Sequence, residues 1–174
     1  MDVIEIAFEV IDMRSFSNLW FWIALAVLWS STSHWPMGVP HDMIYRARRE
    51  GGQAEQDLSD LAQINARRVL SVIDHALLAV IGIGSFWLTV LATLAFYYDL
   101  EFAQALFLLS APMTLVVWHS GRTARRVMQV AGDGDALRRA LLWHRRVTQI
   151  VGMIAVLVTA LYGTWQNFNT PVLH

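Results

Sequence analysis

Four histidines, His34, His75, His119 and His144, fall at the ends of the four long apolar stretches of this chain. If these stretches are helices that cross a membrane, the four imidazoles lie at one depth. A pair of them could then hold haem iron, or a divalent metal with a carboxylate orienting one ring. We favour His75 with His119 or His34 as the cofactor pair, because His144 precedes two arginines and is expected to be too exposed.

The same histidines have a second interpretation as part of an interface belt. His34, His119 and His144 each adjoin a tryptophan, and rings with one polar edge collect at the depth of lipid headgroups. Haem ligands in helical bundles usually lie a turn or more inside a span, whereas these histidines lie at its edge. We favour the belt, so no cofactor and no metal are expected, with haem as the alternative.

The residue types that are absent exclude several chemistries. Having no cysteine excludes disulfides, thiolate metal sites and cysteine-held iron–sulfur clusters. Having no lysine excludes lysine nucleophiles and Schiff bases. No catalytic motif is present either, so we predict that the protein is not an enzyme.

The basic residues are all arginine, and twelve of the thirteen lie in two stretches, 46–68 and 122–146. Guanidinium groups keep their charge and bind carboxylates or phosphates through two parallel hydrogen bonds. They could therefore dock an acidic partner protein or anchor the chain to anionic lipid. A nucleic-acid partner is not expected, because no aromatic residues interleave the arginines and residues 41–71 carry five arginines against five acids. The predicted contact residues are Arg48, Arg49, Arg67, Arg68, Arg125, Arg126, Arg138, Arg139, Arg145 and Arg146.

The elements that position these residues are four apolar stretches, 16–35, 76–98, 102–119 and 147–165, each about as long as a membrane-spanning helix. They predict an all-α integral membrane protein, with residues 1–174 as a single membrane domain. The positive-inside rule places both arginine-rich connections, 41–75 and 120–146, in the cytoplasm and both termini in the periplasm of a bacterial inner membrane. Residues 1–15 are too acidic for a signal peptide and predict an amphipathic helix on the outer surface.

Each arginine-rich connection is predicted to be a helical hairpin with a glycine turn. The helix after Gly52 should run unbroken into the second span, and Asp135 could cap a similar helix that continues into the fourth. The two halves of the chain share this order of elements, which suggests a parallel repeat with two spans in each half. The alternative is convergence, since any membrane hairpin of this topology has arginines at its cytoplasmic ends. The apolar stripe of the first hairpin is Leu58, Leu61, Asn65, Val69 and Val72.

Small residues predict where the spans pack closely, and proline predicts where one bends. Pro112 in the third span should kink it. The small residues are Gly82, Gly84, Ser85 and Thr89 in the second span, and Ala155, Thr159 and Gly163 in the fourth.

Several short segments together carry a resemblance to a known family. They are DMRSFSNLW at 12–20, GVP at 38–40, RARR at 46–49 and EFAQA at 101–105. With them the chain resembles, over nearly its whole length, a small family of four-span inner-membrane proteins from Rhodobacter-type alphaproteobacteria. The family has no established activity, so the resemblance implies no functional residues. Some members are labelled as a component of an iron–sulfur assembly complex, which a chain without cysteine or a nucleotide motif does not support.

These observations favour a non-enzymatic accessory subunit or scaffold of the inner membrane, which docks a partner through its arginine-rich hairpins. The expected partners are membrane lipids and another membrane or cytoplasmic protein, or further copies of the chain. One alternative is a haem- or metal-binding electron carrier that uses the histidines. The other is an oligomeric channel or transporter, lined by Ser30, Ser33, Ser85, Thr89 and Thr114.

Overall fold

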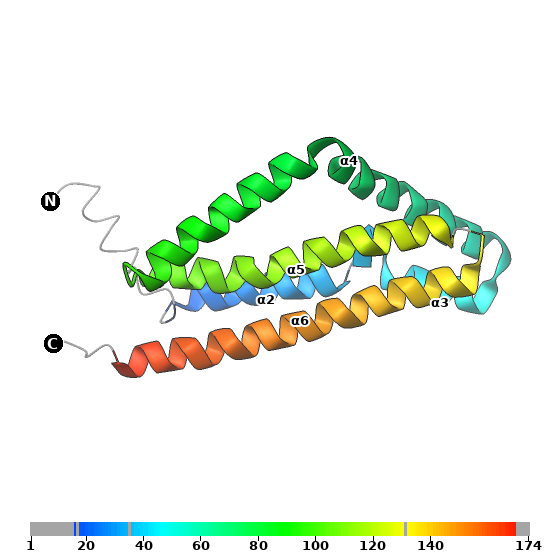
Figure 1. The fold of residues 1–174 in the computed structure, drawn as a ribbon. Helices are drawn as coiled ribbons and strands as arrows, with labels where there is room; N and C mark the ends of the chain where they lie inside the picture. The colour runs from blue at the N-terminus through cyan, green and yellow to red at the C-terminus, as the bar shows by residue number, and fades with distance from the viewer. Residues whose placement is uncertain (1–15, 17, 35, 131, 170–174) are drawn as a thin grey trace, which may run out of the picture.

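The computed structural model describes residues 16, 18–34, 36–130 and 132–169, and within this part of the chain it is helical with no strand. The helix predicted for residues 1–15 lies outside the described residues. Figure 1 shows the long helices lying side by side. The elements are α2 (Leu19–His34), η2 (Pro36–Gly38), α3 (His41–Glu50), α4 (Gly52–Phe96), α5 (Glu101–Gln129) and α6 (Gly134–Asn169).

Three helices are long and apolar enough to cross a membrane: α4, α5 and α6, the last over Gly134–Phe168. The stretch predicted as the first span forms α2, which has 16 residues. A helix of that length is about 24 Å long, somewhat less than the hydrocarbon core of a typical bilayer. The described residues thus contain three candidate spans and a shorter apolar helix, and the count of four spans stays a prediction.

The helix after Gly52 does run into the second span, because α4 is one helix from Gly52 to Phe96. It is bent at Ala76, where φ is −128° and ψ is 15°. The His75 side chain lies one residue earlier, with its Nδ1 2.8 Å from the Ser71 carbonyl oxygen. In a regular helix that oxygen accepts a hydrogen bond from the His75 backbone N–H. At the bend the imidazole therefore competes with this N–H for the same acceptor. α5 continues through Pro112 as one helix, and the kink predicted there stays a prediction.

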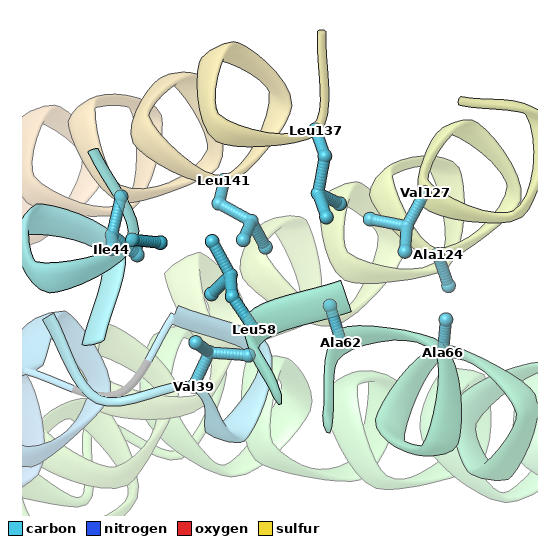
Figure 2. Packing of buried hydrophobic residues seen from close by; sticks show 10 residues of the cluster. Val39, Ile44, Leu58, Ala62, Ala66, Ala124, Val127, Leu137 and Leu141 are labelled. Atoms are coloured by element: carbon cyan, nitrogen blue, oxygen red, sulfur yellow. The ribbon is translucent and has the colours of Figure 1, made fainter. Parts of the chain in front are cut away.

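Both predicted hairpins are present and pack into a common core, as Figure 2 shows. The first is α3 with the beginning of α4; the second is the end of α5 with the beginning of α6. We call this part of the molecule the arginine-rich end. The buried residues of its core are Val39, Ile44, Ala47, Leu58, Ala62, Ala66, Ala124, Val127, Leu137 and Leu141. Four of these ten residues are alanines, which lets the helical segments approach one another closely.

The cap predicted at Asp135 is wrong by two residues. Ala136 N–H donates to the Asp133 carboxylate over 3.0 Å, so Asp133 caps α6 at the usual position. The Asp135 carboxylate instead accepts a hydrogen bond from Arg138, one turn further along the helix.

The small residues of α6 form a tight seam, as predicted. A Cβ at Gly152 would lie 2.7 Å from the Trp29 ring of α2, and one at Gly163 would lie 2.9 Å from the Phe16 ring. Ala155 is buried in the same seam with Leu25 of α2. The first described residues of α2 and the last of α6 consequently lie at the same end of the molecule, opposite the arginine-rich end (Figure 1).

The small residues of α4 behave differently, and the prediction of close packing there is wrong. A Cβ at Gly82 or Gly84 would meet nothing within 4 Å. Beyond its bend, α4 returns to α5 at Trp87, whose Nε1 donates to Ser110 Oγ over 3.5 Å, and then near the turn, where Leu91 and Ala95 pack on Ala103. Only 6% of the most apolar stretch of α4 is buried, against 28% for α6, so this arm of α4 is the least packed span.

Candidate functional site at the arginine-rich end

A pocket of about 480 Å³ lies between α3 and α6 at the arginine-rich end. We call it the arginine pocket, because five of its lining side chains are arginines. The α3 side is formed by His41, Ile44, Tyr45 and Arg48, and the α6 side by Asp135, Arg138, Arg139, Leu142, Arg145, Arg146 and Gln149. Its size falls in the range of small-ligand pockets, and its charge would suit a carboxylate or a phosphate.

One of these arginines, Arg138, forms ion pairs that stabilise the fold. Arg138 Nη1 donates to Glu55 Oε1 of α4 over 2.7 Å, and Arg138 Nη2 donates to Asp135. Glu55 can approach because position 134 is glycine: a Cβ there would lie 1.5 Å from Glu55 Oε1. The carboxylate also sits beside the first turn of α6, where the helix dipole favours negative charge. Arg138 therefore connects α6 to α4 through its ion pair with Glu55.

The other four arginines of the pocket, Arg48, Arg139, Arg145 and Arg146, make no ion pair with the residues that the structure describes. Arg145 is the most telling of them. Its Nε and Nη1 are buried and find no hydrogen-bond partner in the described part of the chain. Leaving such donors unpaired costs about 1–3 kcal/mol each, so the pocket favours an anionic group that would accept from them.

The structure thus gathers half of the predicted contact arginines in one pocket and leaves the rest apart. Four of the remainder, Arg49, Arg67, Arg68 and Arg126, are exposed on other faces of the same end, and Arg125 lines a separate groove between α4 and α5. Sequence reasoning missed His41 and Tyr45, which line the pocket, and Glu55, which pairs with Arg138, because their roles depend on contacts between helices far apart in the sequence.

His144 is buried, so the prediction that it is exposed is wrong. Only 3% of it is accessible, and its ring stacks on that of His119 with centroids 5.0 Å apart and planes 9° apart. Thr123 Oγ1 lies 3.1 Å from His144 Nδ1 and donates its proton to the His119 carbonyl oxygen over 3.0 Å. A hydroxyl has one proton to give, so Thr123 accepts from His144, whose Nδ1 must be the protonated nitrogen.

Burial lowers the pKa of His144 to about 4, with the neighbouring His119 as the second cause. The imidazole is therefore neutral at pH 7. This agrees with the tautomer inferred from the hydrogen bonds, since a neutral imidazole has one N–H, which His144 donates to Thr123 Oγ1.

The histidine geometry differs from what a haem site needs. Ligand lone pairs lie in the plane of an imidazole, so two rings stacked face to face cannot both point at an iron between them. The ring contact of His119 is with His144 and not with His75, which is exposed and whose Nδ1 meets the Ser71 carbonyl. The side chain of His34 lies outside the described ones. Among the residues described, no cluster of three or more acidic or histidine side chains could hold a metal ion.

The described chain is thus an all-helical protein with three helices long enough to cross a membrane and a packed, arginine-rich end. No family model, curated protein or solved structure matches it. Function is therefore inferred from the site alone.

Proposed function

We propose that this chain is a non-enzymatic accessory subunit or scaffold of a bacterial inner membrane, related to the small four-span proteins that it resembles. The arginine pocket binds a carboxylate-rich segment of a partner protein. The observation that carries the proposal is the set of four arginines without an ion pair around one pocket, with buried and unpartnered N–H groups on Arg145.

The proposed topology has both termini in the periplasm and the arginine-rich end in the cytoplasm. Its support is the distribution of arginines, which collect in the connections that face the cytoplasm. In this topology α2 is a fourth, short span beside α5 and α6, and its length is accommodated by local thinning of the bilayer or by tilt of its neighbours. An even number of spans agrees with α2 starting and α6 ending at the same end of the molecule (Figure 1).

The arginines of the pocket extend from helices that are held in place, which suits the pocket to docking a partner protein. α3 and α6 both contribute to the common core through Ile44, Ala47, Leu137 and Leu141, so the guanidinium groups extend from helices whose backbones are held in place. Arginines that extend from a fixed backbone lose less entropy on binding than those on a mobile surface segment, and they recognise carboxylates by bidentate geometry.

The test is affinity purification of the tagged, full-length protein from its own membranes, with quantitative mass spectrometry of what co-purifies. Arg139→Glu with Arg146→Glu reverses two exposed charges of the pocket that hold no ion pair in the described structure. Breaking a hydrogen-bonded charge pair at an interface costs about 2–5 kcal/mol, so partner recovery should fall about 30-fold or more. A synthetic polyglutamate peptide should displace the same partner from the unmodified protein.

The matched control is Arg67→Glu with Arg68→Glu, which makes the same change of charge on exposed α4 residues outside the pocket. It should retain the partner, and both variants should remain in the membrane fraction. Equal recovery from both variants, or equal loss from both, would show that the arginine pocket is not the docking site.

A further inference from the structure

A second cavity, of about 840 Å³, lies between the bent arm of α4 and α5, on the face of the molecule that a bilayer would surround. We call it the α4–α5 groove. Its walls are mostly apolar side chains, and several of them are exposed in the chain by itself. Representative lining residues are Leu77, Val80 and Ile81 of α4, Val117 and Trp118 of α5, and Leu28 of α2.

The path of α4 creates the groove. At the arginine-rich end α4 touches α5 so closely that a Cβ at Gly121 would lie 2.8 Å from Ile73 Cδ1. The bend at Ala76 then carries α4 away from α5, and contact resumes where Trp87 donates to Ser110 and, further on, around Leu91 and Ala103. The lining on α4 runs from Ile73 to Leu88, a rise of about 22 Å along a helix.

The groove has one charged end. Arg122 and Arg125 of α5 line it next to the arginine-rich end, and no acidic residue lines it anywhere. Both arginines are exposed and make no ion pair within the described chain. The Arg122 guanidinium lies 3.7 Å from the centre of the Trp118 ring, which orients it at the mouth of the groove. An occupant that matches both ends has an anionic head and an apolar tail.

We propose that the α4–α5 groove binds one anionic phospholipid, with its phosphate at Arg122 and Arg125 and an acyl chain between α4 and α5. This rests on the membrane location proposed above, but not on the partner-docking role. One leaflet of the hydrocarbon core is about 15 Å thick, so the groove is long enough for an acyl chain. Basic pockets between spans on the cytoplasmic side are typical sites for anionic headgroups.

The test is native mass spectrometry of the full-length protein in detergent, titrated with phosphatidylglycerol or phosphatidylethanolamine of the same acyl chains. The unmodified protein should retain one phosphatidylglycerol in preference to phosphatidylethanolamine. Arg122→Gln with Arg125→Gln should reduce that preference about tenfold, since each arginine contributes to attraction of an anionic headgroup. The same substitutions at Arg67 and Arg68, which lie outside the groove, should leave the preference unchanged.

A pair of glycines supplies a control for the tail. Gly84 lines the groove and Gly82 does not, and a Cβ at either meets nothing within 4 Å. Gly84→Trp should fill the groove and abolish retention of either lipid, whereas Gly82→Trp should not. Because the chain has no cysteine, Ser85→Cys in the groove and Thr164→Cys on α6 can each carry a photo-crosslinker without altering the charged end. The first should capture phospholipid and the second should not.

Three outcomes would overturn the proposal. They are an unchanged phosphatidylglycerol preference in the double glutamine variant, unchanged lipid retention in Gly84→Trp, and capture of a second chain in place of lipid by the Ser85→Cys crosslinker. Loss of the protein partner in the docking experiment leaves these lipid measurements unaffected, so the two proposals fail separately.

Discussion

Acidification should destabilise the fold through His144, the buried histidine between α5 and α6. Its ring is neutral, stacked on His119 and hydrogen-bonded to Thr123, and its pKa is lowered from 6.5 to about 4 by burial and by His119. Between these two values the unfolded chain binds a proton that the folded chain does not. The stability of the folded state is therefore complete above pH 6.5 and falls as the pH drops toward 4.

The size of the effect follows from the two pKa values. At pH 5 the unfolded state gains about 2 kcal/mol relative to the folded state from this one group. For a chain of this length, that corresponds to a fall of about 4–8 °C in the temperature of unfolding. The penalty arises because a protonated His144 would be a buried cation beside a second imidazole, with no described carboxylate against it.

The assay is thermal unfolding of the purified protein in detergent at pH 7.5 and pH 5.0. His144→Gln should be less stable at pH 7.5 but should lose most of the acid-induced fall, because an amide can still donate to Thr123 and does not titrate. His75→Gln, which changes an exposed histidine, should keep the full acid sensitivity. If His144→Gln shows the same fall as the unmodified protein, or if histidine NMR shows His144 titrating near 6.5, the reasoning is refuted.

Two glycine substitutions test the close contacts between helices. Gly134→Ala should cost about 1–3 kcal/mol in thermal unfolding, because its Cβ would displace the Glu55 carboxylate from its ion pair at the start of α6, whereas Gly132→Ala, with open space around it, should be neutral. Gly163→Leu should cost about 1–3 kcal/mol by overpacking the seam, and the matched Gly82→Leu should cost nothing; equal stability of the two leucine variants would contradict the seam.

The helical continuity of the hairpins could be predicted from the sequence, but the core that they form could be predicted only in part. The stripe expected on α4 rested on large apolar residues, and Leu58 is indeed fully buried. The other buried positions in this part of α4 are Ala54, Ala62 and Ala66, while Val72 at the end of the predicted stripe is 55% exposed. Alanines carry little weight in a hydrophobicity pattern, yet they are what lets α4 lie against α5 at Ala124.

The small residues of α4 and α6 follow the same sequence pattern, but their surroundings in the structure differ. Both helices have small residues at helical spacing, but only the glycines of α6 meet side chains of other segments. The difference comes from the bend at Ala76, which moves this part of α4 away from α5. That bend involves a histidine side chain rather than a proline, and nothing in the local sequence shows that this histidine contacts the backbone of its own helix.

The burial of His144 could have been anticipated from the period of α6. Neighbouring residues on a helix point about 100° apart, so Arg145 and Arg146 say little about the direction of His144. The buried positions of α6 fall three or four residues apart along its whole length, and His144 is one of them. They are Leu137, Leu141, His144, Thr148, Gly152, Ala155, Thr159, Gly163 and Gln166.

The chemistry of this stripe changes along the helix, and the change agrees with the proposed position of the bilayer. Leucines occupy it at the arginine-rich end, where water makes the burial of large apolar side chains favourable. From Thr148 onward the buried residues are small or polar while the exposed ones are large and apolar, such as Ile154 and Leu161. Lipid tails are as apolar as leucine, so helices within a bilayer associate through close backbone approach instead. His144 lies between the part of the stripe that packs through leucines and the part that packs through small residues, close to the start of the span predicted at 147.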